Sequence, residues 1–142
     1  MPHNKFNIYI ATCVADDGTF YYSWKSNFNK TYSGYGGPIP QSYKSPDSTA
    51  TVYCGLAHVC GWLSSFTELE KIDVVFKLSD ADVVNSFLML QSHPVMNTVT
   101  ITIINSVISD IRNVSWRIVH KEKNAALPLA MRTAMWRHEI FF

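Results

Sequence analysis

The stretch Ile72–Phe87, IDVVFKLSDADVVNSF, decides how the rest of the sequence is interpreted. Apolar residues alternate along positions 74–78, which is typical of a strand, and then recur at a helical spacing from 83 to 87. The period changes at Ser79-Asp80, where we predict that a strand ends and a helix begins. In an open α/β sheet, ligands bind at the carboxyl ends of strands, so Asp80 is a candidate metal ligand. Asp is also a common helix cap, and both roles stay open at this point.

Length and composition indicate one domain spanning residues 1–142, because 142 residues with 47% hydrophobic and 16% charged residues suit a globular core. The polar start MPHNKFNIYI and the lack of a long apolar run predict a cytoplasmic protein. A net charge of +1 gives no global attraction for nucleic acid, so such binding needs a local basic patch. Cys54 and His58 share a helix spacing without a second ligand pair, and we interpret them as structural residues.

Outward from the central stretch, the N-terminal half predicts three strands and a helix. Alternating residues over 6–15 and 19–26 flank Asp16-Asp17-Gly18, a strong signal for a β-hairpin turn. We interpret the two Asp residues as turn residues rather than as a catalytic pair. A third strand is expected over 30–35, and a helix from Ser48 or Thr49 to about Ser64.

The C-terminal half predicts a helix over 81–90, a helix over 97–113, a strand over 114–119, a polar loop over 121–124 and a helix over 125–138. The TVTITII run within 97–113 has strand propensity. However, Ile101, Ile104, Ile108 and Ile111 keep a helical repeat, which favours a helix.

Three segments lie at the junctions of these elements, namely Ser48–Leu56, Ser79–Asn85 and His120–Ala130. They resemble, in order, the opening of the first helix, a Ser-Asp-Ser-x-x-Val-Val-Asn strand end, and the last loop and helix of the type 1 ribonuclease H family, nearest to its plant-like and reverse-transcriptase-associated branch. The resemblance covers nearly the whole chain. It implies an α/β fold with a five-stranded mixed sheet, three antiparallel strands followed by two parallel ones, flanked by helices.

Enzymes of this family cut the RNA strand of an RNA/DNA hybrid with two metal ions, held by four carboxylates. The resemblance places those positions on Ala11, Val52, Asp80 and either Leu127 or Pro128. Only Asp80 could bind magnesium, because the side chains at the other positions are apolar. Two divalent ions need several acids to neutralise them. Shifting the alignment within either helix does not supply the missing acids, because positions 48–65 and 124–136 contain no acid. Asp82, just along the next helix, could lend one further oxygen.

We therefore expect a catalytically degenerate ribonuclease H-like domain that is retained for binding and needs no cofactor. In one hypothesis it binds RNA or an RNA/DNA hybrid through Ser48, Thr49, Lys121, Lys123, Trp24 and Lys25. In another it is a protein-interaction module, such as a viral or accessory factor, that uses its aromatic hairpin or the C-terminal segment Trp136–Phe142. A third hypothesis, a divergent nuclease, would require magnesium or manganese.

Overall fold

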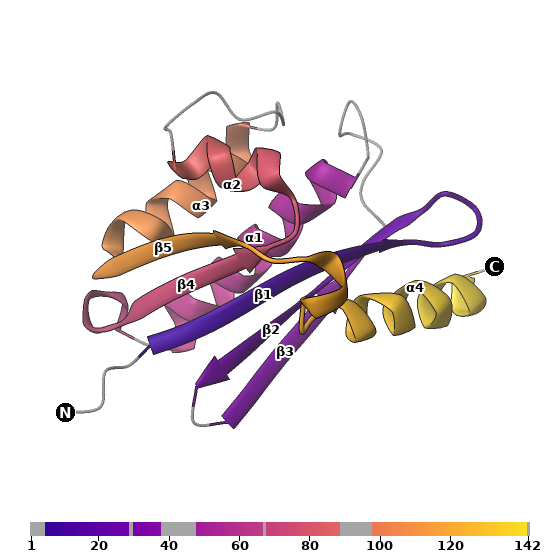
Figure 1. Cartoon of the computed structure of the whole chain (residues 1–142), viewed down its shortest axis with the longest axis horizontal. Coiled ribbons are helices and arrows are strands. Elements are labelled where there is room, and N and C mark those ends of the chain that lie inside the picture. Colours follow the sequence, from indigo (N-terminus) through magenta and orange to yellow (C-terminus); the bar gives the residue numbers. More distant parts are fainter. Residues whose placement is uncertain (1–4, 29, 38–47, 67, 89–97, 142) are drawn as a thin grey trace.

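A computed structural model describes residues 5–28, 30–37, 48–66, 68–88 and 98–141. Five strands form one mixed sheet in the order β3-β2-β1-β4-β5 (Figure 1). The strands are β1 (Lys5–Val14), β2 (Phe20–Phe28), β3 (Lys30–Gly36), β4 (Asp73–Leu78) and β5 (Asn113–Ile118). The first three pair antiparallel, while β4 lies parallel to both β1 and β5. The predicted α/β class and the mixed sheet are therefore confirmed.

Four α-helices cover the sheet unequally. They are α1 (Ser48–Phe66), α2 (Ala81–Leu88), α3 (Thr98–Asp110) and α4 (Leu127–Phe141), with short 3₁₀ turns η1 (Leu69–Lys71) and η2 (Lys121–Lys123). Helices α1, α2 and α3 contribute to one core on the same face, whereas α4 lies on the other face against β1, β2 and β3 (Figure 1). Within the described ranges, no helix combines the length and the apolar character needed to span a bilayer.

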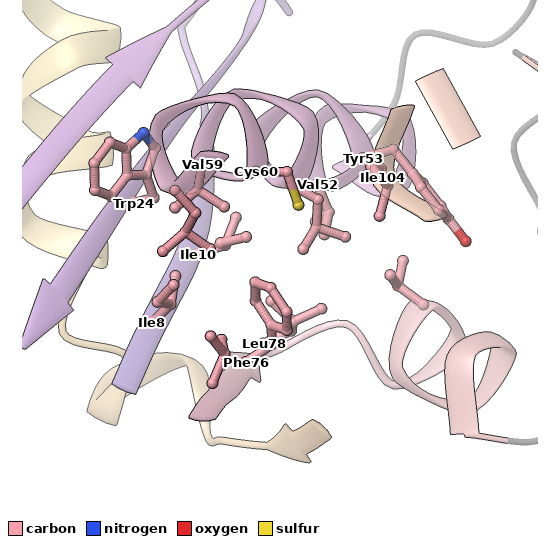
Figure 2. Close-up of a cluster of buried hydrophobic side chains, with 14 of the residues drawn as sticks. Ile8, Ile10, Trp24, Val52, Tyr53, Val59, Cys60, Phe76, Leu78 and Ile104 are labelled. Atoms are coloured by element: carbon pink, nitrogen blue, oxygen red, sulfur yellow. The ribbon is translucent and has the colours of Figure 1, made fainter. Parts of the chain in front are cut away.

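The main core forms between α1 and the strand residues that point toward it. Ile8 and Ile10 of β1 face Phe76 and Leu78 of β4 in register, and all four side chains are buried beneath α1 (Figure 2). This pairing explains the alternation along 74–78, because every second residue of a strand points to the same face. The predicted helical repeat is also confirmed, since Ile104 of α3 is fully buried in this core.

The hairpin between β1 and β2 turns at Asp16-Asp17-Gly18, as predicted. Gly18 has a positive φ of 88°, which a residue without Cβ adopts readily. The Asp17 carboxylate accepts a hydrogen bond from the Thr19 N–H at 3.0 Å. Asp17 therefore serves the turn.

Boundaries differ from the sequence expectations at a few places. Asn113 was expected at the end of a helix but opens β5, where its side chain donates to Asp73 at 2.9 Å. The loop expected over 121–124 contains the η2 turn, and the final helix begins at Leu127 rather than at 125. The part of the second helix expected beyond Leu88 lies outside the described residues.

Two glycines of α1 allow the packing of this helix on the sheet to be tested. A Cβ at Gly55 would lie 2.9 Å from Cγ2 of the buried Ile10, whereas a Cβ at Gly61 would meet nothing within 4 Å. We expect Gly55→Ala to destabilise the protein by about 1–3 kcal/mol, because overpacking outweighs the better helix propensity of Ala. Gly61→Ala should instead stabilise it by up to about 1 kcal/mol. Urea unfolding of both variants measures the difference, and equal effects would contradict the close approach of α1 to β1.

Candidate nucleic-acid interface

A pocket of about 330 Å³ lies where the carboxyl ends of β1 and β4 meet the starts of α1 and α4. It is lined by Ile10, Ala11, Thr12, Ser48, Val52, Ser79, Asp80, Ala81, Lys121 and Leu127. The chain segments that meet here are far apart in the sequence, and the parallel pairing of β1 with β4 brings them to one edge of the sheet. The pocket therefore occupies the position at which open α/β sheets hold ligands.

The three apolar positions singled out from the sequence all line this pocket. Ala11 and Val52 are almost fully buried, at 6% and 4% exposure, and Leu127 is half-buried. Ala11 packs with Ala126 and Ala130 under α4, so β1 and α4 close together on that side. The floor of the pocket is consequently apolar, while Pro128, the other candidate position, is exposed and does not line it.

Asp80 supplies the one carboxylate among the residues that line the pocket. Its Oδ1 accepts hydrogen bonds from the N–H groups of Asp82 at 3.1 Å and Val83 at 3.2 Å, which are the cap bonds predicted for the start of α2. Its Oδ2 accepts a hydrogen bond from the Thr49 hydroxyl at 2.8 Å. Both oxygens are therefore engaged with the protein.

Tyr53 lies in the core, close enough to Asp80 for the carboxylate to interact electrostatically with its phenol. Burial raises the pKa of the Tyr53 phenol to about 12, opposed by a hydrogen bond with Ser86 and reinforced by the negative charge of Asp80. The phenol stays protonated at neutral pH, so Tyr53 is a core residue and adds no second anion beside Asp80.

The starts of α1 and η2 provide the polar rim of the pocket. The hydroxyls of Ser48 and Thr12 lie 3.0 Å apart, within hydrogen-bonding distance. Lys121 is exposed and lines the pocket, whereas Lys123 is exposed two residues further along. Ser48 and Lys121 are thus brought together with Asp80 as expected, and the Thr49 hydroxyl is occupied by the Asp80 carboxylate.

Asn124 fixes the rim to the sheet. Its side-chain N–H₂ donates to the Ile10 carbonyl at 2.8 Å and to the Ser79 hydroxyl at 3.2 Å, and its Oδ1 accepts from the Ala126 N–H at 3.0 Å. Asn124 is 2% exposed, and its bonds to Ile10 and Ala126 are shielded from water. Sequence reasoning placed Asn124 in a loop motif but gave it no role in the site, and it missed Thr12, which carries no local signal.

The structure overturns the expected role of Trp24. This side chain is only 2% exposed and packs beneath α1, with its ring centroid 4.8 Å from that of Trp62 (Figure 2). Lys25 points to the opposite face of β2, because successive residues of a strand alternate. Trp24 and Lys25 therefore do not form one edge of the pocket, and the aromatic hairpin face belongs to the core rather than to a contact surface.

The lining of the pocket does not fit a pair of divalent metal ions. Asp82 is exposed in the first turn of α2 and is not part of the lining. Besides Asp80, the lining side chains offer neutral hydroxyls, apolar groups and the Lys121 ammonium. Magnesium prefers several oxygen ligands that include carboxylates. No group of three His, Cys, Asp or Glu residues suited to a metal occurs among the described residues.

No family model and no curated protein matches this sequence. Solved structures do match. A ribonuclease H1 isolated from compost by a metagenomic approach, LC11-RNase H1, is 16% identical with a TM-score of 0.71, covering 95% of this chain and 98% of its own. The same enzyme in complex with an RNA/DNA hybrid is 15% identical with a TM-score of 0.67, covering 92% and 99%. The N-terminal RNase H domain of rv2228c from Mycobacterium tuberculosis, solved as a fusion with maltose binding protein, is 12% identical with a TM-score of 0.68, covering 89% and 95%.

These similarities extend over most of each chain, with TM-scores of 0.68 and 0.71 for two of them. Identities of 12 to 16% are too low to carry over an activity. The chain has the ribonuclease H-like fold.

Proposed function

We propose that this chain is a catalytically degenerate ribonuclease H-like domain that binds RNA or an RNA/DNA hybrid without cleaving it. The observation that carries the proposal is the pocket in which Ala11, Val52, Asp80 and Leu127 meet. The family resemblance assigns a metal-binding carboxylate to each of these four positions, and one is present. A two-metal mechanism needs a clamp of several acids, so hydrolysis of a phosphodiester lacks its metal site here.

Binding is supported by the polar rim and by the fold. Lys121 and Lys123 are exposed cations beside the pocket, and Ser48 offers a hydroxyl at the start of α1. Lysines, hydroxyls and helix N-termini are common partners of phosphate oxygens. LC11-RNase H1, which has the same fold, has been solved in complex with an RNA/DNA hybrid.

The alternative, a protein-interaction module, draws support from α4. Met131, Met135 and Trp136 are 50%, 65% and 53% exposed on this helix, and large exposed apolar side chains mark many protein contacts. Near-neutral net charge also suits such a role. Of the two surfaces first considered, the hairpin has its Trp24 buried in the core. In the segment Trp136–Phe142, Trp136 is exposed, and the side chains beyond it lie outside the described residues.

The first prediction concerns catalysis. Purified protein should not cleave an RNA/DNA hybrid in magnesium or manganese, because the pocket lacks the acids of a two-metal site. Gel analysis of a labelled hybrid measures cleavage, with Asp80→Asn as the control for contaminating nuclease. Metal-dependent cleavage that disappears in Asp80→Asn would overturn the proposal and establish the divergent nuclease.

The second prediction concerns the structural role of Asp80. Asp80→Ala should lower the free energy of unfolding by about 1 kcal/mol, the usual cost of losing a helix cap. Asp80→Asn keeps an oxygen acceptor for the Asp82 and Val83 amides, so its loss should be smaller. Urea unfolding compares the two variants. Equal stability of Asp80→Ala and the parent protein would show that the cap contributes nothing.

The third prediction concerns the rim. Lys121→Ala with Lys123→Ala should weaken binding of an RNA/DNA hybrid and reduce the salt dependence, log Kd against log salt, by about 1.4 to 1.8 for two lost phosphate contacts. A chelator should leave affinity unchanged. Fluorescence anisotropy at several salt concentrations measures both.

The matched control for the rim is Lys71→Ala with Arg132→Ala, which removes the same charge from exposed positions elsewhere. Equal binding by the rim variant and the parent protein would place the nucleic-acid contact outside this rim. Failure to bind any RNA, DNA or hybrid at low salt would favour the protein-interaction module.

A further inference from the structure

The face of the sheet that carries α4 is only partly covered. Helix α4 packs on β1, β2 and β3, and among the described elements no helix lies in front of the same face of β4 and β5 (Figure 1). A groove of about 510 Å³ runs over this face, with polar and charged side chains of β1, β4 and β5 along it. It shares no lining residue with the pocket at Asp80.

Strand register aligns one aromatic and three basic residues across this face. Tyr9 of β1 pairs with Lys25 of β2 on one side and with Lys77 of β4 on the other, and Lys77 pairs with Arg117 of β5. With strands about 4.8 Å apart, the row crosses four strands and about 14 Å. The next row places Asn7 and Ser115 on either side of Val75.

The face is strongly basic for a protein whose net charge is +1. Lys5, Lys25, Lys77 and Arg117 lie on it, and none of them forms an ion pair with a described acid. Asp73 is the acid that shares the groove, and its Oδ1 accepts from Arg112 and Asn113 at 2.9 Å each. Asp73 is thus paired with Arg112, and none of the four cations on this face is paired with it.

Tyr9 lies half-buried within this basic row. The Lys77 ammonium lies 5.1 Å from the Tyr9 ring centroid and 3.4 Å from its hydroxyl. This contact keeps an aromatic ring and a cation side by side on an open sheet. Proteins that bind single-stranded nucleic acid combine these two elements, since bases stack on the ring while cations hold the phosphates.

We propose that this face binds single-stranded nucleic acid, with the phosphates along Lys25, Lys77 and Arg117 and a base stacked at Tyr9. The complementary charge favours a polyanion, and the tyrosine favours one that carries bases over an acidic peptide. This site goes beyond the proposed function, because it requires neither Asp80 nor the rim lysines. The pocket rim and the sheet face have in common only that each would bind nucleic acid.

The test uses a fluorescein-labelled oligothymidylate of about 12 nucleotides, within the range of sites on single strands. Lys77→Gln with Arg117→Gln should weaken binding and reduce the salt dependence by about 1.4, or about 0.7 for each lost phosphate contact. Lys71→Gln with Arg132→Gln removes the same charge elsewhere and should bind like the parent protein. Tyr9→Ala should lower affinity by roughly 5- to 150-fold through lost stacking, while Tyr9→Phe should retain it.

Each outcome separates the two sites. Unchanged binding in the Lys77 and Arg117 variant, with loss in the Lys121 and Lys123 variant, overturns the sheet-face site and leaves the proposed function intact. The reverse result supports the sheet face, and it overturns binding at the rim if the Lys121 and Lys123 variant also binds the RNA/DNA hybrid as tightly as the parent protein. Competition by polyaspartate as effective as that of unlabelled oligothymidylate would identify an acidic peptide as the ligand and overturn the assignment.

Thermal melting monitored by circular dichroism verifies that Tyr9→Ala is folded. The single variant Arg117→Gln, at an exposed position, should still reduce the salt dependence of binding.

Discussion

The side-chain amide of Asn124 joins three of the four parts of the molecule that meet at the pocket. It binds the backbone of β1 at Ile10, the residue after β4 at Ser79, and the backbone just before α4 at Ala126. Because the amide is buried, removing it would leave a carbonyl and an N–H without partners, at a cost of about 1–3 kcal/mol each. One residue outside any long element therefore sets how α4 meets the sheet.

The two candidate surfaces are separated by the geometry of β1. Ala11 and Tyr9 point to the same face of this strand two residues apart, and α4 begins to cover that face near Ala11. The pocket with the apolar floor lies at the strand ends, and the polar face lies further down the sheet. The two surfaces differ in what packs on them: Ala11 packs against Ala126 and Ala130 at the start of α4, while no helix in the described part of the chain covers Lys77 and Arg117.

Local signals in the sequence predicted most of the fold. The change of period at Ser79-Asp80 and the Asp-Gly turn depend on neighbouring residues, so they could be found without a structure. Alternation places Trp24 and Lys25 on opposite faces of their strand, but it does not tell which face a distant helix covers. Both residues were expected to contact the ligand, and Trp24 is buried. The row through Tyr9 and Lys77 depends on register between strands 68 residues apart in the sequence, which no local pattern reveals.

The two engaged oxygens of Asp80 have a consequence for how such proteins diverge. A carboxylate that caps α2 and binds Thr49 remains under selection for stability after any catalytic need has gone. Acids without such partners can drift to alanine, valine or leucine at little cost to folding. An acid at this strand end can therefore be kept for stability alone, so its presence does not by itself indicate a metal site.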